Sequence, residues 1–288
     1  MNMRSLPLLV LVLLTVAGRA QEVIGTDGPL AEATHLVKRL KLATTDPQRD
    51  SINLRLKEAV RTVLESEDAL TRPLDELPLS RVDAPDGSFR LITWNIPYSD
   101  GHHGYEGFLL HTKGRGSALV ELQDRSGTMD QPELPITNAE RWYGALYYDV
   151  VQVKSGGRTY YTLLGWKGHS RVETRKVIEV LSFKGGRPVF GATLFGSGRD
   201  RKARVVFAYN FQVSMSLRGD QKAGRIIFSH LVPAKADQVG QYAFYGPDQS
   251  FDSYDWDKSK WVFQRDIDVR DITRDGRPYN APPSTPRR

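Results

Sequence analysis

KVIEVLSF, residues 176–183, combines β-branched, aliphatic and aromatic residues and runs directly into Lys184-Gly185-Gly186. The earlier segment TYYTLLGW (159–166) has a similar composition and follows Ser155-Gly156-Gly157. Residues of these types favour strands, and paired glycines suit tight hairpin turns because glycine reaches positive φ without steric strain. The two segments therefore predict neighbouring antiparallel strands joined by hairpin turns.

Further strands are predicted on both sides of this pair. They are WYGALYYDVVQV (142–153), ARVVFAYN (203–210), QVSMSL (212–217), RIIFSHL (225–231) and WVFQRDIDV (261–269). In total we expect about a dozen strands and no helix after residue 90. Parallel strands need crossover helices, so the sheets should be antiparallel. The predicted fold class is mainly β, a meander closing as a sandwich or barrel, with an incomplete propeller as the alternative.

The chain before residue 89 has a different composition. All 28 aromatic residues lie at Phe89 or later, whereas LAEATHLVKRLKLA (30–43) and SINLRLKEAVRTVLES (51–66) place apolar residues at helical spacing. Between them, Thr45-Asp46-Pro47 suits a helix start, with a capping residue followed by proline in the first turn. We predict a helical hairpin that packs one apolar stripe against the β region.

The ends and the charge pattern set the expected organisation. MNMRSLPLLVLVLLTVAGRA (1–20) has the charged, apolar and small-residue order of a secretory signal peptide. Its removal would lower the formal net charge from +6 to +4, because it contains Arg4, Arg19 and no acidic residue. The expected boundaries are signal peptide 1–20, helical hairpin 21–66, linker 67–86, antiparallel β domain 87–272 and a disordered basic tail 273–288.

The chain contains no cysteine, which excludes disulfides, thiol catalysis and cysteine–zinc sites. Export makes nucleic acid an unexpected partner, despite a sequence pI near 9.4. No segment after the signal peptide is long and apolar enough to suggest a transmembrane span. We therefore expect a periplasmic or secreted protein without a cofactor.

One ten-residue pattern occurs twice. PDGSFRLITW (85–94) and PDQSFDSYDW (247–256) share five residues and lie 162 positions apart, close to four blades of a propeller. No intermediate copy is present at the blade spacing. The simpler interpretation is local, because proline presets a turn, aspartate accepts a backbone hydrogen bond in it and a strand begins at phenylalanine.

Part of the chain resembles a known group of proteins. The matching segments are WYGALYY (142–148), YTLLGW (161–166), TRKVIEVLSF (174–183), SHLVP (229–233) and YGPDQSFDSYDW (245–256). They resemble exported, uncharacterised proteins of the Bacteroidota, over roughly residues 85–272. The resemblance implies a protein of a Gram-negative envelope, and because the group has no established activity it carries over no functional residue.

Candidate metal and acid sites are weak. SDGHHGYEGFLLH (99–111) holds three of the six histidines, but His102 and His103 are adjacent and would point to opposite faces of an extended chain. We therefore expect a solvated loop and no metal. Asp266 and Asp268 would share a strand face, as a glycosidase carboxylate pair could, although a solvated polar stripe is the commoner arrangement.

Motifs for other chemistry are missing. GSGRD (196–200) lacks the spacing of a nucleophile elbow, and no P-loop, HExxH or dinucleotide fingerprint occurs. We assign no catalytic residue and no cofactor, and we regard catalysis as the less favoured class.

Two function classes remain. The favoured one is an exported, non-catalytic protein that binds a glycan, a peptide or an envelope protein through aromatic rings and nearby cations. The candidate binding residues are Trp94, Tyr98, His102, His103, Trp166, Lys167 and Arg175. The alternative is a hydrolase that acts on an envelope polymer through loop carboxylates or histidines. The oligomeric state is not indicated by the sequence.

Overall fold

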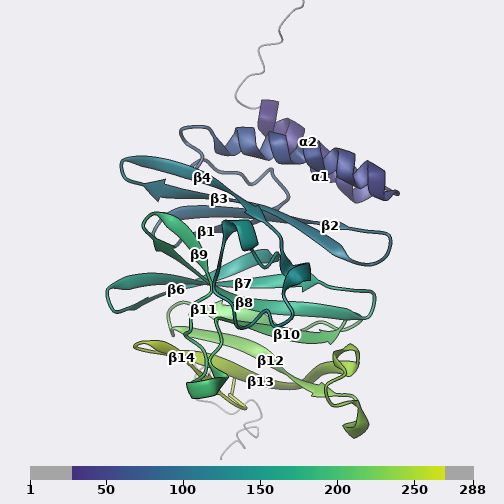
Figure 1. Cartoon of the computed structure of the whole chain (residues 1–288), viewed down its shortest axis with the longest axis vertical. Coiled ribbons are helices and arrows are strands. Elements are labelled where there is room, and N and C mark those ends of the chain that lie inside the picture. Colours follow the sequence, from purple (N-terminus) through teal and green to yellow (C-terminus); the bar gives the residue numbers. More distant parts are fainter. Residues whose placement is uncertain (1–27, 270–288) are drawn as a thin grey trace, which may run out of the picture.

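The computed structural model describes residues 28–269, so the predicted signal peptide and basic tail lie outside the described residues. Within this range two α-helices and 14 strands form four stacked layers, a helical hairpin followed by three antiparallel sheets (Figure 1). The layers follow one another in chain order. The predicted mainly β fold with an N-terminal helical hairpin is confirmed.

The helical layer consists of α1 (Gly28–Leu42) and α2 (Asp46–Leu64). Thr45 is the N-cap of α2, its hydroxyl accepts a hydrogen bond from the amide of Gln48 at 3.4 Å, and Pro47 lies in the first turn. Proline is tolerated there because its missing N–H would have no partner inside the helix. The apolar stripes of both helices are buried, as their spacing predicts.

The first sheet has the order β1-β2-β3-β4, with β1 (Ser80–Asp83), β2 (Phe89–Pro97), β3 (His103–Lys113) and β4 (Gly116–Gln123). One face packs on the helices, where Leu36, Leu56 and Phe108 are fully buried in the first core cluster. The other face packs on the central sheet. The stretch 67–86, predicted as a linker, contains β1, a short strand that the surrounding prolines obscure in the sequence.

The central sheet has the order β5-β9-β8-β7-β6, and β10 pairs with the first half of β8. Its strands are β5 (Thr137–Asn138), β6 (Leu146–Ser155), β7 (Arg158–Gly168), β8 (Glu173–Lys184), β9 (Arg187–Phe190) and β10 (Arg204–Asn210). Both faces are covered, which explains the uninterrupted apolar runs. The φ angles of Gly156, Gly157, Gly185 and Gly186 lie between 55° and 73°, as expected for the predicted hairpin turns.

The third sheet has the order β11-β12-β13-β14, with β11 (Leu217–Asp220), β12 (Arg225–Pro233), β13 (Tyr245–Asp257) and β14 (Lys260–Gln264). Trp261 and Phe195 are fully buried between this sheet and the central one. Two strand predictions are wrong in extent. Residues 212–216 are not a strand, and β14 ends at Gln264 because Asp266 has a φ of 54° that no strand accommodates.

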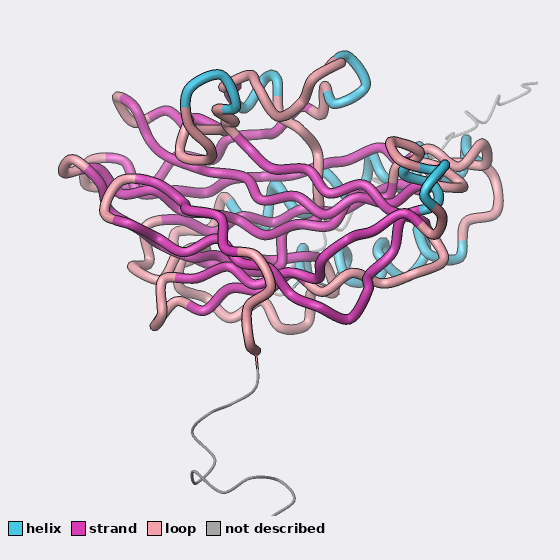
Figure 2. The backbone as a smooth tube through the Cα atoms, turned by 90° about the horizontal axis from the view of Figure 1, so that it is seen from below, coloured by secondary structure: helices cyan, strands magenta, loops and turns pink. Residues whose placement is uncertain are grey.

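Short 3₁₀ turns lie in the loops between strands. They are η1 (Ser126–Thr128), η2 (Ala139–Arg141), η3 (Gly198–Asp200), η4 (Ala236–Gln238) and η5 (Tyr242–Phe244). Viewed from the side of the third sheet, the strands of the layers run in similar directions (Figure 2). The sheets are stacked face to face as in a sandwich, and they do not surround an axis as propeller blades would.

The repeated PD-x-S pattern builds the same local turn twice. Asp86 Oδ1 accepts the amide hydrogen of Ser88 at 3.1 Å, and Asp248 Oδ1 accepts that of Ser250 at 3.0 Å. The residues between them, Gly87 and Gln249, have φ angles of 69° and 75°. The two copies therefore share turn chemistry. The first turn precedes β2, whereas the second lies within β13.

A buried ion pair joins β8 and β10. The Arg204 guanidinium donates to Glu179 Oε2 at 2.7 Å, and both side chains are fully buried. Arg204 also donates to the carbonyl oxygens of Pro132 and Pro135, which fixes the loop before β5 to the sheet. Burial raises the pKa of Glu179 above its ordinary value. The pair thus anchors a connection between layers in the protein interior.

Among the described residues, no helix combines the length and apolar character needed to cross a membrane.

Candidate functional site

A large hollow lies on the central sheet, on the face toward the third sheet. We call it the β7–β9 groove, defined by Arg158, Tyr160, Ser182, Lys184, Ala192 and Leu194. Its volume is about 890 Å³. Side chains alternate along a strand, so Tyr160 and Ser182 share the face of Leu164 and Val180, which pack toward the third sheet farther along the same strands. The groove is thus a part of this face that remains open.

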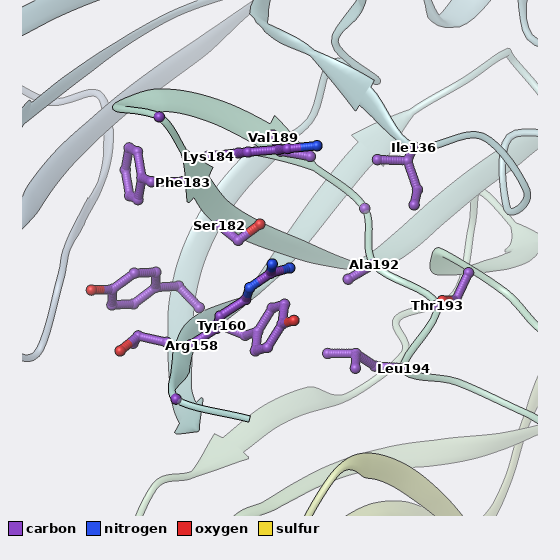
Figure 3. A pocket seen from close by; sticks show the side chains of 15 residues that line it. Ile136, Arg158, Tyr160, Ser182, Phe183, Lys184, Val189, Ala192, Thr193 and Leu194 are labelled. Carbon is purple, nitrogen blue, oxygen red and sulfur yellow. The ribbon is translucent and has the colours of Figure 1, made fainter. Parts of the chain in front are cut away.

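The two walls of the groove differ in chemistry. Arg158, Tyr160, Ser182 and Lys184 come from β7 and β8, and they face the space bounded on the other side by Ile136 and the chain after β9 (Figure 3). The opposite wall, formed by Ile136, Ala192, Thr193 and Leu194, is mostly apolar. A flat ring, hydroxyls and cations on one wall can stack against and hydrogen-bond to a polar ligand.

The charged side chains that line the groove are all positive. Its described lining includes two cations and no carboxylate. Arg158 and Lys184 are both exposed, and in the part of the chain that the structure describes neither has a recorded ion-pair partner. Their positive potential therefore acts on whatever enters the groove, and it favours an anion.

The predicted binding residues gather elsewhere, at the opposite end of β7. There the turn between β2 and β3 meets the turn between β7 and β8, and Arg171 donates to the carbonyl oxygen of Ser99 across the junction. The rings of Tyr98 and His102 are stacked with centroids 4.4 Å apart. The His103 and Trp166 rings meet edge to face at 5.8 Å.

The two adjacent histidines have different surroundings. His102 is exposed and pairs with Asp100, whereas His103 is half-buried and lies 2.8 Å from the Asn95 amide nitrogen. Burial, together with the positive charge of Lys167, lowers the pKa of His103. No group of three or more potential metal ligands occurs within residues 28–269.

Trp94 is not an exposed surface ring. It is 3% exposed, packs in the first core cluster and donates its indole N–H to Asn53 Oδ1 at 2.7 Å. The expectation that Trp94 is an exposed aromatic ring is therefore wrong. The helical layer covers this face of β2, and a sequence pattern does not show which face of a strand is covered.

Lys167 is also buried, with 4% exposure. Its Nζ donates to the Gly144 carbonyl oxygen at 2.7 Å and to Ser126 Oγ at 2.9 Å. It lies 3.9 Å from the centroid of the Tyr105 ring, a cation–π distance. Burial lowers the pKa of Lys167 to about 8. A lysine in such surroundings is unusual, because a buried ammonium must be compensated by neighbouring groups.

Arg175 makes three hydrogen bonds to its neighbours. Its guanidinium donates to Glu173 Oε1 at 2.7 Å, to the Tyr143 hydroxyl at 3.2 Å and to His169 Nε2 at 2.9 Å. Burial and the adjacent guanidinium lower the pKa of His169. Arg175 and His169 line a second hollow of about 510 Å³, the β7–β8 cleft, defined by Ser126, Met129, Gln131, His169, Arg175 and Tyr242.

The predicted carboxylate pair does not form on a strand. Asp266 lies beyond β14 in a left-handed conformation, and its amide donates to Asp252 Oδ1 at 3.0 Å. Asp252 is itself buried and lies 2.7 Å from His230 Nδ1. Asp252 is thus used inside the structure, whereas Asp266 and Asp268 are exposed and follow the end of β14, so the two carboxylates do not share a strand face.

Sequence reasoning missed the β7–β9 groove. Its cations, Arg158 and Lys184, flank the two Gly-Gly turns and appear as ordinary hairpin residues in the sequence. The sequence feature that could have indicated the groove is the alternation in RTYYT (158–162), which places Arg158, Tyr160 and Thr162 on one face of the strand. Comparison with protein-family models, curated proteins and solved structures finds no match for this chain.

Proposed function

We propose that the protein is an exported, periplasmic or secreted binding protein that holds an anionic glycan segment in the β7–β9 groove. The observation that carries this proposal is the lining of the groove, which combines Tyr160 with hydroxyls and two cations that no carboxylate neutralises. The export itself rests on the sequence of residues 1–20, which has the features of a signal peptide.

A sugar carrying carboxylates fits this lining best. Tyr160 offers a ring for stacking against a pyranose face, and Ser182 and Thr193 offer hydroxyls that can both donate and accept hydrogen bonds. Arg158 and Lys184 provide charge-assisted hydrogen bonds to carboxylates. A protein partner would be expected to bury a larger and flatter surface than this groove presents.

Calorimetric titration with a galacturonic acid tetrasaccharide and with its fully methyl-esterified form tests the proposal. The two sugars differ only in the masked charge, so the acid should bind and the ester should bind at least tenfold more weakly. The acid should also lose affinity as the salt concentration rises. An acidic peptide of similar charge serves as a third ligand.

Variants locate the binding. Replacing both Arg158 and Lys184 by alanine should weaken acid binding tenfold or more, which corresponds to about 1.4 kcal/mol. Tyr160→Ala should weaken both charged and neutral sugars. Lys38→Ala removes one exposed charge from α1 and should change nothing. Binding that is unaffected by the groove variants, or that occurs only with the peptide, would overturn the proposal.

A further inference from the structure

Ser126 and Lys167 form a polar pair at the opposite end of β7 from the β7–β9 groove. Ser126 begins η1, directly after the chain leaves β4, and Lys167 is the next-to-last residue of β7. The distance from Lys167 Nζ to Ser126 Oγ is 2.9 Å. A hydroxyl within hydrogen-bond reach of an amine is the arrangement in which the amine can take the hydroxyl proton.

Lys167 is held in one position. The Gly144 carbonyl oxygen accepts a second hydrogen bond from Nζ at 2.7 Å, and the Tyr105 and Tyr143 rings lie beneath and beside the ammonium at 3.9 and 5.1 Å. The carbonyl and the rings stabilise the ammonium, but burial disfavours the charged form more strongly, so the amine is neutral more often than it would be in water. With a pKa of about 8, roughly a tenth of the molecules carry a neutral Lys167 at pH 7.

Ser126 is accessible while Lys167 is not. The serine is half-buried and lines the β7–β8 cleft, whose volume is about 510 Å³. Lys167 does not line the cleft, and its Nζ lies behind Ser126, 2.9 Å from the serine Oγ. A substrate in the cleft therefore reaches the nucleophilic oxygen first, and the base stays shielded behind it.

We propose that Ser126 is the nucleophile and Lys167 the general base of an acyl-transfer site that hydrolyses small O-acyl esters bound in the β7–β8 cleft. Pairs of serine and lysine serve as nucleophile and base on unrelated folds, so the chemistry requires only this geometry and a neutral amine. The site uses no residue of the β7–β9 groove, so either proposal can fail without the other.

The reaction balances without a further reagent. Ser126 Oγ attacks the ester carbonyl carbon and gives its proton to Lys167 Nζ. The bond from the acyl carbon to the alcohol oxygen then breaks, and the departing oxygen takes the proton from Nζ. In the second half, water attacks the acyl carbon and gives a proton to Nζ. The bond from the acyl carbon to Ser126 Oγ then breaks, and Oγ takes the proton back from Nζ, which releases the carboxylic acid and restores the serine and the neutral lysine.

The cleft in which the negative charge would develop is lined by a cation. The Ser126 amide already donates to Asp124 Oδ1 at 2.9 Å, so it does not face the substrate. Arg175 lines the same cleft and supplies positive charge there. We assign it stabilisation of the oxyanion through its positive charge.

The pH dependence follows from the groups that face Lys167. Asp124 raises its pKa, and Arg175 lowers it together with burial. The other titratable neighbours are His103, Tyr105, Tyr143 and His169. The two histidines have lowered pKa values and are neutral at pH 8, so the acylation rate should follow Lys167 alone and reach half its maximum near pH 8.

The test uses 4-nitrophenyl acetate and the full-length protein. Stopped-flow release of 4-nitrophenolate reports acylation, and peptide mapping by mass spectrometry locates the acetyl group. We expect acetylation of Ser126 with the pH profile given above. Ser126→Ala should lower the acylation rate at least a hundredfold, whereas Ser117→Ala, which changes an exposed serine of β4, should leave it unchanged.

Lys167→Met keeps an unbranched apolar side chain in the buried position and should also lower acylation at least a hundredfold. If this variant does not fold, as judged by circular dichroism, the pH profile of the wild type decides the role of Lys167. Acetylation spread over surface lysines with Ser126 unmodified, or a rate that is the same in Ser126→Ala, would overturn the proposal.

Discussion

At the scale of single residues, Lys167 is the least ordinary feature of the molecule. Its ammonium lies between the first and central sheets, among the Tyr105 and Tyr143 rings, with the Gly144 carbonyl and the Ser126 hydroxyl as its hydrogen-bond acceptors. A buried charge is costly unless neighbouring groups compensate it, and burial lowers the pKa of Lys167 to about 8. The residue therefore couples stability to pH.

The free energy of unfolding should rise with pH in the window where only the folded protein has released the Lys167 proton. The pKa of Lys167 is about 8 in the folded protein and has its ordinary value of 10.5 in the unfolded chain. The unfolded chain then binds more protons between these values, so alkalinity favours folding. From pH 8 to pH 10, wild-type stability should increase by about 2–3 kcal/mol relative to Lys167→Met.

Urea denaturation of both proteins at several pH values measures this difference. Lys38→Met, which changes an exposed lysine on α1, is the matched control and should run parallel to the wild type. If the free energies of unfolding of wild type and Lys167→Met changed with pH in parallel as well, the expected coupling would be refuted.

At the scale of elements, the repeated PD-x-S turns allow a paired test. Gln249 occupies a left-handed conformation at a φ of 75°, whereas the equivalent residue of the first turn is Gly87 at 69°. That conformation costs a residue with a side chain about 1–2 kcal/mol, and part of this is offset by the greater freedom of glycine in the unfolded chain. Gln249→Gly should therefore stabilise the protein by up to about 1 kcal/mol.

The reverse change, Gly87→Gln, should destabilise the protein by about 1 kcal/mol. Nothing lies within 4 Å of a Cβ atom placed at Gly87, so the conformation alone is tested. Both residues are exposed, and chemical denaturation gives both values. The two substitutions are opposite, so their effects on the free energy of unfolding should have opposite signs. If both changed it in the same direction, the two turns would not be equivalent.

Much of the element-level structure could be predicted. The helical stripes, the Thr45 cap and the Gly-Gly turns depend on neighbouring residues, and the structure has them where the sequence indicates. The strand expected at 212–217 was wrong because alternation alone does not supply a pairing partner. Which face of β2 would be covered, and hence the burial of Trp94, depends on helices more than 30 positions away.

The candidate sites were harder to predict for the same reason. Lys167 and Arg175 were singled out as surface cations, but the structure buries the first and pairs the second internally. Ser126 precedes Lys167 by 41 positions, and no spacing rule joins the two. The β7–β9 groove exists because the third sheet leaves part of the central sheet uncovered, which is a property of layer packing.

At the scale of the whole molecule, three apolar cores share two sheets. The first sheet contributes to the first and second cores, and the central sheet contributes to the second and third. Leu109 of β3 and Leu110 beside it, for example, are buried in different cores. Because each of these sheets packs in two cores, unfolding of one layer should disrupt the core of the next. We therefore expect the layers to unfold as one unit.

Leu56→Ala tests this cooperativity. Leu56 is fully buried between the helices and the first sheet, so its truncation should lower the free energy of unfolding by about 2–5 kcal/mol. Leu54→Ala, at a position 69% exposed on the same helix, should change it by less than about 0.5 kcal/mol. Hydrogen exchange then measures the protection of the backbone amides in each layer separately.

In Leu56→Ala, the most protected amides of β12 in the third sheet should lose as much protection as those of β3. Loss confined to the first sheet would mean that the layers open independently.

The order of the layers has a consequence for synthesis. When the N-terminal end of the chain emerges first, each layer can pack on the preceding layer before the next segment emerges. This is possible because every sheet packs on a layer that precedes it in the sequence. No late-arriving strand has to be inserted between finished layers. The topology thus suits a polypeptide that is threaded through a narrow pore and assembles progressively on the far side.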